Sequence, residues 1–329
     1  MPADDAVQTA YDGAGLDGNG FRIAGGTYAG YYFKSGATVS FTLRGGGEDF
    51  TTATYNDGTE HGIDPVGGTY SFTMPAVDGV TVSISHSLIL ADLADNSAAI
   101  AAAAATGLPF DVTLDGRKLY KDGYWNTLCL PFGFTAEDIA KSPLAGCTLM
   151  KLDGDASGLD NEGTLTLTFV KATEIEPSLP YIIKWDKDDE HPTIDDPVFE
   201  NVSVTSQVPF AVEFGGCKFV GQYDMFPIND ANRFTIIMLG AENKIGYSAE
   251  PRDLHPFRAH FEVPQSLAVK GYSISFGKAG EATGILSTPA LLHSLPADWN
   301  YYTLHGRRQP AKPTAKGVYI HGGRKIVIK

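Results

Sequence analysis

A strict alternation of apolar and hydroxyl-bearing residues limits the folds that are open to this chain. Leu165, Leu167 and Phe169 alternate with threonines. The same period of two recurs at Thr38–Leu43 and at Gly79–Ser85. Successive side chains of a strand point to opposite faces, so each segment predicts a strand that buries one face and exposes the other.

Glycines separate these segments and indicate tight turns. The 329 residues include 37 glycines, 43% of the chain is hydrophobic, and only 19% is charged. This composition excludes a disordered chain and favours short strands joined by turns. The fold class that we predict is therefore all-β, with multi-domain β-sandwiches, antiparallel pairing and one short Ala-rich helix.

Changes in composition suggest where the domains of this chain meet. Ala98–Ala105 is almost pure alanine and lies between the candidate N-cap residues Asp95–Ser97 and Gly107. That segment predicts a short helix. We therefore divide the chain into a first β-sandwich unit, a helical connector, a main β-sandwich domain, and a linker with a small C-terminal β-hairpin region, at 1–88, 89–106, 107–279 and 280–329.

The main domain is organised around Arg117–Phe134, which reads RKLYKDGYWNTLCLPFGF. Asp122-Gly123 is a good two-residue turn, so this stretch predicts a hairpin with one strand on each side of the turn. A lone hairpin cannot hide the apolar residues of its two arms. Other strands must close over it, and about twelve short strand candidates in the main domain are available to do so.

The same stretch resembles a signature of secreted and cell-surface β-sandwich proteins of gut Bacteroidetes. Further pieces that resemble this module follow in order at Ala172–Trp185, Ile236–Tyr247 and Phe257–Val263. The resemblance implies that the protein is secreted or carried on the cell surface. It implies an architecture and a location, and no activity.

Both ends of the chain carry further resemblances. Ser35–Leu43 and Gly67–Ser85 are similar to the small immunoglobulin-like repeats of bacterial surface proteins, most of which are spacers or adhesive units. At the other end, Asn300–Arg308 and Lys312–Lys329 resemble the C-terminal sorting domain of the type IX secretion system. These resemblances also imply export.

The charge of the chain bears on its partners. The formal net charge is −14, and an acidic body is a poor partner for nucleic acid because phosphate repels it. The segment from Trp299 to Lys329 is basic, with no Asp or Glu. We interpret it as a solvated hairpin face, and docking on an acidic partner is the alternative. No apolar run is long enough for a transmembrane helix.

Tyr120, Tyr124 and Trp125 are the candidate ligand-binding residues. Flat exposed aromatic rings form platforms on which sugar rings stack, and they bury a large area at low entropic cost. The same residue types also fill the cores of β-sandwiches. The sequence leaves both interpretations open.

The acidic runs give weaker candidates. Asp153, Asp155 and Asp160 partly match a calcium loop, although Thr164 stands where that loop needs a Glu. The run Asp186–Asp196 carries adjacent carboxylates, whereas a glycosidase needs two that are held about 5–10 Å apart. We interpret the first run as a surface turn and the second as a solvated loop. We therefore predict no metal, no cofactor and no catalytic residue, and serine or histidine motifs of hydrolases are missing from the sequence.

The three cysteines are Cys129, Cys147 and Cys217. Cys129 lies within an apolar segment and is expected to behave as a small buried hydrophobe. A bond between Cys147 and Cys217 is possible, but spacing alone cannot establish it.

Three functions remain open from the sequence. The first is a non-catalytic, adhesin-like module that binds a glycan or a host or bacterial surface protein. The second is a structural spacer that displays another region of a longer surface protein. The third is an enzyme related to glycoside hydrolases, which would need two buried, facing acids with raised pKa values.

Overall fold

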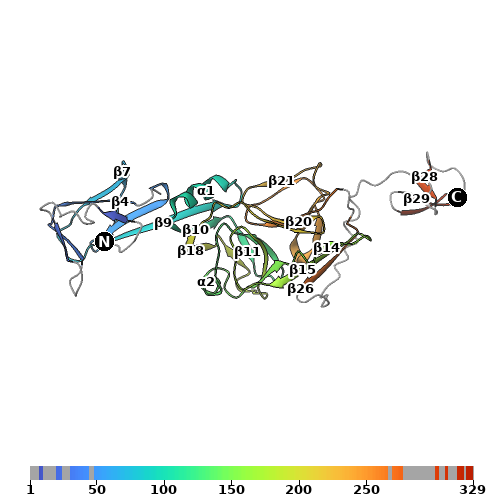
Figure 1. Cartoon of the computed structure of the whole chain (residues 1–329), viewed down its shortest axis with the longest axis horizontal. Coiled ribbons are helices and arrows are strands. Elements are labelled where there is room, and N and C mark those ends of the chain that lie inside the picture. The colour runs from blue at the N-terminus through green and yellow to red at the C-terminus, as the bar shows by residue number, and fades with distance from the viewer. Residues whose placement is uncertain are drawn as a thin grey trace.

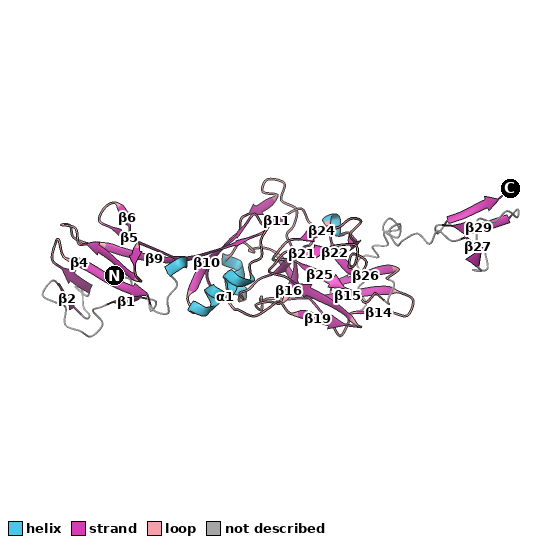
Figure 2. Cartoon of the chain, turned by 90° about the horizontal axis from the view of Figure 1, so that it is seen from above, coloured by secondary structure: helices cyan, strands magenta, loops and turns pink. Residues whose placement is uncertain are grey.

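The computed structural model describes residues 7–9, 20–23, 30–43, 48–265, 269–276, 301–303, 308–309, 317–321 and 324–328. Side chains are described within 33–43, 48–265 and 269–276. The elements of these ranges are mostly strands, which confirms the predicted all-β class (Figure 2). Their helices are α1 (Ser97–Thr106), α2 (Ala136–Lys141) and the short 3-10 turns η1 (Glu48–Phe50) and η2 (Ala241–Asn243).

The N-terminal region is a small sandwich of two sheets. One sheet has the order β1 (Val7–Thr9), β4 (Thr38–Leu43), β8 (Thr69–Thr73) and β7 (Pro65–Val66). Apart from these two sheets, β2 (Gly20–Ile23) and β3 (Gly30–Phe33) form a separate strand pair. The facing layer contains β5 (Thr51–Asn56), β6 (Glu60–Gly62) and half of β9 (Thr81–Ala91). Between the layers, Phe41 stacks on Tyr70 at 5.2 Å in a core that includes Val82. The alternation at 38–43 therefore buries one face, as predicted.

Strand β9 is shared between this sandwich and the main body (Figure 1). Residues 81–86 pair antiparallel with β5, and residues 87–91 pair in parallel with β10 (Pro109–Asp115). Val82 lies in the N-terminal core, whereas Leu88 and Leu90 lie in a core of the main body. The sequence predicted that this strand ends at Ser85. It continues to Ala91 because the alternation of apolar and polar residues continues.

The predicted all-antiparallel pairing is wrong at two places, β9 with β10 and β15 (Thr164–Lys171) with β26 (Gly271–Phe276). Parallel neighbours need a crossover connection, which is usually a helix. Helix α1 supplies it between β9 and β10, and it packs Ile100 and Ala103 into the core below. Gly107 ends the helix with a φ of 66°, as predicted.

The N-terminus of α1 is held from a distant segment of the chain. Asn96 is the N-cap residue, but its side chain makes no capping hydrogen bond. The carboxylate of Asp224 instead accepts from the backbone N–H groups of Asn96 and Ser97 and from the Ser97 hydroxyl, at 2.5–2.8 Å. The helix is thereby fixed to the sheets of the main body. Helix α2 was not predicted, although Thr135 and Asp138 form a capping box.

The main body contains two large sheets. The central sheet has the order β12 (Asn126–Cys129), β16 (Pro180–Lys184), β13 (Thr148–Leu152), β15 and β14 (Gly158–Leu159), with β26 beside β15. The outer sheet has the order β19 (Ala211–Phe214), β20 (Cys217–Gly221), β25 (Ala259–Glu262), β22 (Ile236–Leu239) and β23 (Ile245–Tyr247). The two sheets face each other across the sandwich core, where Phe169 and Phe219 pack edge to face at 6.0 Å.

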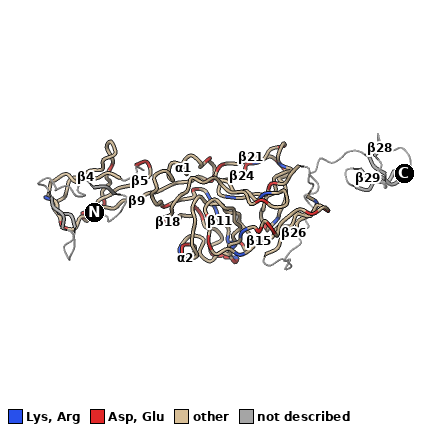
Figure 3. Tube along the Cα trace, viewed as in Figure 1, with Lys and Arg blue, Asp and Glu red and all other residues tan. Residues whose placement is uncertain are grey.

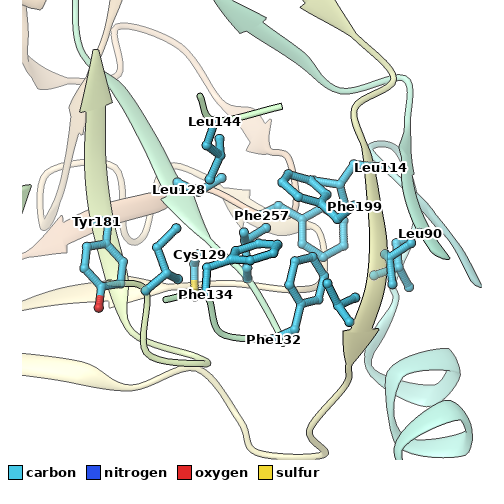
Figure 4. Packing of buried hydrophobic residues seen from close by; sticks show 14 of the residues in the cluster. Leu90, Leu114, Leu128, Cys129, Phe132, Phe134, Leu144, Tyr181, Phe199 and Phe257 are labelled. Carbon is cyan, nitrogen blue, oxygen red and sulfur yellow. The ribbon is translucent and has the colours of Figure 1, made fainter. Parts of the chain in front are cut away.

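The central sheet is also buried on its other face. Ile182 belongs to the sandwich core, while its neighbours Tyr181 and Ile183 belong to a second cluster, the linking core. The linking core also contains Leu90 and Phe132, and it joins the central sheet to β9, β10, β18 (Val198–Ser203) and α1 (Figure 4). The main body therefore has a third layer that the predicted two-sheet sandwich lacks.

The predicted hairpin within Arg117–Phe134 is wrong. The first arm, β11 (Lys118–Tyr120), pairs with β17 (Thr193–Asp195), and the second arm, β12, pairs with β16. A further two-stranded sheet joins β21 (Phe226–Ile228) to β24 (Arg252–Leu254). Each arm pairs with a strand from later in the chain, and so the two arms do not pair with each other.

A four-stranded C-terminal sheet has the order β28 (Arg308–Gln309), β27 (Tyr301–Thr303), β29 (Gly317–His321) and β30 (Arg324–Ile328). Strands β29 and β30 pair antiparallel, as predicted for this region. The predicted turn at Gly322-Gly323 and the predicted linker that begins at residue 280 lie outside the described residues.

The three cysteines are free. Cys129 is buried in the linking core as predicted, and Cys147 packs against the same core. Cys217 lies in the sandwich core, on the other side of the central sheet. The bond between Cys147 and Cys217 that the sequence left open is therefore not formed, because the two thiols lie in different cores.

Strand β9 offers a matched pair of substitutions. Leu90 is 0% exposed and its neighbour Ile89 is 68% exposed. We expect Leu90→Ala to lower the free energy of unfolding by about 2–5 kcal/mol because it leaves a cavity in the linking core. Ile89→Ala should change it by less than about 1 kcal/mol. Urea unfolding followed by circular dichroism measures both, and equal losses would contradict the assigned faces of β9.

The cysteines give a second test of the layers. Burial raises the pKa of the Cys147 thiol to about 11 and also raises the pKa values of Cys129 and Cys217. We expect the folded protein to react slowly with a thiol reagent at neutral pH and to release its full complement of thiols once unfolded in guanidinium. A disulfide-linked peptide in a non-reducing digest would contradict this assignment.

Candidate functional site

The three predicted aromatic residues line one open groove with a volume of about 430 Å³. The groove lies where the loop after β11 and the start of β12 meet the turn after β22. Its lining residues are Arg117, Tyr120, Asp122, Tyr124, Trp125, Asn126, Thr127, Leu239, Gly240, Ala241 and Arg258. The structure thus brings together residues of the sequence signature with residues that lie more than a hundred positions later in the chain.

A side chain shapes the loop between the two strands of the signature. The Asn126 side chain accepts from the N–H of Tyr120 at 3.1 Å and donates to the carbonyl of Tyr120 at 2.9 Å. A side-chain amide has the same donor and acceptor as a peptide group. The Asn126 side chain therefore makes the two hydrogen bonds to Tyr120 that a paired strand would have made in the predicted hairpin. Asp122 accepts from the N–H of Tyr124, and Gly123 adopts a φ of 84°, so Asp122-Gly123 does form a turn.

The acidic run Asp186–Asp196 supports this loop. The sequence interpretation of the whole run as a solvated loop is wrong, because Thr193–Asp195 forms β17 and pairs with β11. In addition, Lys121 forms an ion pair with Asp188 at 2.8 Å. Hydrogen bonds from Lys121 and His191 hold the pKa of the Asp188 carboxyl down at about 2. The run therefore positions one wall of the groove.

The three aromatic residues differ in exposure. Tyr120 is 48% exposed and Tyr124 is 38% exposed, so both rings are open to solvent at the groove. Trp125 is half-buried, stacks on Phe276 at 5.0 Å and packs against the sandwich core. The Lys184 ammonium lies over its indole ring, 5.0 Å from the ring centroid. The two tyrosines fit the platform interpretation, and Trp125 also fits the core interpretation.

Trp125 also borders a second cavity of about 150 Å³ at the edge of the sandwich core. Apolar residues form most of its wall, including Phe169, Leu239, Ile274 and Phe276. The backbone N–H of Trp125 donates to the side chain of Asn243 at 2.7 Å, and Asn243 lines this cavity as well. Trp125 is thus fixed in a wall shared by the groove and the cavity.

Two arginines that sequence reasoning missed complete the lining of the groove. Arg117 is only 4% exposed, and its Nη2 donates to the carbonyl of Thr127 at 2.9 Å. Burial, followed by the proximity of Arg258, lowers the pKa of Arg117 to about 9, so it stays charged at neutral pH. A signal was present in the sequence: Arg117 and Leu119 share one face of an extended segment, and Leu119 is an inward-facing residue.

Arg258 belongs to a charged cluster beside the groove. Its Nη1 and Nη2 both donate to the carboxylate of Asp92, with Nη2 and Oδ2 separated by 3.1 Å. His255 Nδ1 lies 2.9 Å from the same Oδ2. Asp92 is buried directly after β9, so this cluster connects the groove to the shared strand.

The loop that resembled a calcium site builds turns in the structure. One oxygen of Asp153 accepts from the N–H groups of Asp155 and Ala156, and one oxygen of Asp160 accepts from those of Glu162 and Thr164. The bond from Thr164 is the main cause of the lowered pKa of Asp160. The described residues contain no group of three His, Cys, Asp or Glu side chains placed to hold a metal ion.

Comparison with known proteins adds no relative: no family model, curated protein or solved structure matches the chain. Within the described residues, none of the helices has the length and apolar character needed to cross a membrane.

The ion pair that holds the groove loop has a pH signature. Because Lys121 keeps the pKa of Asp188 at about 2, below its unfolded value, the stabilisation is complete above about pH 4 and is lost as the pH falls through 2. We expect Lys121→Met to raise the pKa of Asp188 towards its ordinary value in an NMR titration of side-chain carboxyls. Lys118→Met is the control, because Lys118 pairs with Asp195 instead. An Asp188 pKa near its ordinary value in the unaltered chain would contradict this arrangement.

Proposed function

We propose that this chain is a non-catalytic, glycan-binding module of a secreted or cell-surface protein. The observation that carries the proposal is the groove of about 430 Å³, with Tyr120 and Tyr124 exposed on it and Trp125 in its wall. That volume falls within the range of small-molecule sites. The resemblance of the signature to exported Bacteroidetes proteins supports the location, and its aromatic residues are the ones that line the groove.

The chemistry of the lining suits a sugar. Aromatic faces pack against the apolar faces of pyranose rings, and the two arginines offer hydrogen bonds for ring substituents. The loop is already ordered by the Asn126 side chain and by the ion pair of Lys121, so binding would cost little conformational entropy.

A protein partner receives less support from the surface. The large hydrophobic residues that are exposed in the described ranges, apart from the two groove tyrosines, are spread from β7 to the loop before β19 and form at most small groups, such as Val208 with Phe210; they are Val66, Val77, Ile89, Leu93, Val198, Val208 and Phe210. Scattered residues of this kind are normal on soluble proteins, whereas a docking face for a protein is usually a continuous apolar patch. Acidic and basic residues are likewise interspersed over the main body (Figure 3). Tyrosines gathered at one groove favour a compact ligand.

The carboxyl groups also favour binding over hydrolysis. Among the described residues that line the groove, Asp122 supplies a single carboxyl group. Glycosidases act through a pair of carboxyls, one of which has a raised pKa. Among the described residues, the carboxyls whose pKa is displaced are all lowered, mainly by hydrogen bonds; they are Asp57, Asp138, Asp160, Asp188, Glu242 and Glu262.

A structural spacer is the second candidate, and strand β9 is the observation in its favour. This strand runs without interruption from the N-terminal sandwich into the main body, so the two units are joined by shared hydrogen bonds. A spacer would need that continuity and would not need the groove. Substitutions that disrupt the pairing of β9 therefore test the spacer function, and substitutions in the groove test glycan binding.

Alanine substitution at the groove tests the glycan proposal. We expect Tyr120→Ala and Tyr124→Ala each to weaken binding to glycans identified on an array by about fivefold, or about 1 kcal/mol, because each removes a stacking surface. Phe210→Ala is the matched control, since Phe210 is an aromatic residue of similar exposure (45%) that does not line the groove. Calorimetric titration measures affinity, and thermal melting confirms folding.

An unaltered chain that binds no glycan at millimolar concentration would overturn the proposal in favour of the spacer. Equal losses in the Phe210 and tyrosine variants would show that the groove is not the binding site.

A further inference from the structure

Two arginines line the groove, but the described residues supply a carboxylate partner for only one of them. Arg258 is paired with Asp92 through both of its terminal nitrogens. Both oxygens of Asp92 are occupied by this pairing, and Oδ2 also contacts His255. Asp92 also attracts Arg117 and partly opposes the fall in the pKa of that guanidinium, but among the described residues it forms no hydrogen bond with Arg117.

Arg117 is the arginine without a carboxylate. Only 4% of it is exposed, yet no ion pair is found for it among the described residues. Its Nη2 donates to a neutral carbonyl of Thr127, and its Nε is shielded from solvent and has no hydrogen-bond partner, so the Nη groups are the ones that face the groove. A buried charge of this kind is costly unless it is paired, so the side chain is suited to an anion that arrives from outside the protein.

We propose that the groove binds the carboxylate of an acidic sugar, with Arg117 as the main counter-charge and Arg258 beside it. This inference rests on the proposed glycan-binding function and names the class of glycan. The planar guanidinium fork matches the two oxygens of a carboxylate, which favours a uronic acid over a neutral sugar. The exposed faces of Tyr120 and Tyr124 then pack against the sugar rings.

One acidic residue of the lining sets the orientation of the ligand. Asp122 lines the groove and repels an anion, although one of its oxygens accepts from the N–H of Tyr124. The carboxylate of the sugar therefore points to Arg117 and away from Asp122. The formal net charge of −14 gives no long-range attraction for an acidic ligand, so the preference depends on contact with the arginines.

A matched pair of ligands separates this inference from the proposed function. The full chain is titrated calorimetrically with a uronic acid trisaccharide and with the same trisaccharide as its methyl ester, which keeps the rings and removes the charge. We expect the acid to bind at least tenfold more tightly than the ester, which corresponds to about 1.4 kcal/mol. Equal affinities would overturn the acidic-sugar inference and leave glycan binding intact, whereas no binding of either ligand would count against both.

Substitutions assign the preference to Arg117. Arg117→Met removes the charge at similar volume and should abolish the difference between acid and ester. Lys118→Met is the control, because it removes one positive charge at the next position from a side chain that does not line the groove. A preference that survives Arg117→Met in a folded variant would overturn the role of Arg117.

A third ligand tests the carboxylate itself. A trisaccharide of neutral sugars with one sulfate ester as its only charge should bind less tightly than the uronic acid, and equal or tighter binding would show that the site does not select a carboxylate. If Arg117→Met fails to fold, Arg117→Lys keeps the charge without the planar fork and should reduce the preference by several-fold. The ligand series on the unaltered chain decides the inference in either case.

Discussion

The structure depends on the burial of the central sheet on both faces. In β16, Ile182 faces the sandwich core while Tyr181 and Ile183 face the linking core. Neither the outer sheet nor the layer of β9, β10 and α1 can be removed without exposing one of these faces to water. Hydrophobic burial on two sides therefore fixes the order of the layers, and it also fixes β12, at which the groove loop ends.

The groove is a product of this layering. Arg117–Phe134 leaves the layer of β11, turns at Gly123 and enters the central sheet as β12, so its polar turn lies at the seam between layers. Asn126 closes the turn in place of a strand pairing. The late segments around Ala241 and Arg258 reach the same seam because β22 and β25 belong to the outer sheet. Binding residues are thus carried on loops that rigid sheets hold in position.

Much of the fold followed from the sequence, and the exceptions have physical causes. The period of two located most strands of the main body because half-buried strands require it. It could not identify partners: the two arms of the signature were predicted to pair with each other, whereas β11 pairs with β17 and β12 with β16. The parallel pairs were missed because parallel pairing depends on a crossover, and the Ala-rich helix was not recognised as one. In β16 the absence of alternation at Tyr181, Ile182 and Ile183 was itself a sign of burial on both faces.

The site was predicted less completely than the fold. Tyr120, Tyr124 and Trp125 were selected by residue type, and the structure places all three along one groove. Arg117 was passed over because a single arginine in a strand region is usually solvated. Its hydrogen bond to the Thr127 carbonyl and its proximity to Arg258 arise only in the folded chain. The face that Arg117 shares with Leu119 could have indicated its burial, but the charges that surround it leave no periodic trace in the sequence.

The continuity of β9 has a mechanical consequence. Residues 81–86 are bonded to β5 and residues 87–91 to β10, all along a single extended backbone. A pull that separates the N-terminal sandwich from the main body along this strand loads a whole ladder in shear, so many hydrogen bonds must rupture together. A flexible linker would instead extend first and leave the strand pairing of both units unloaded.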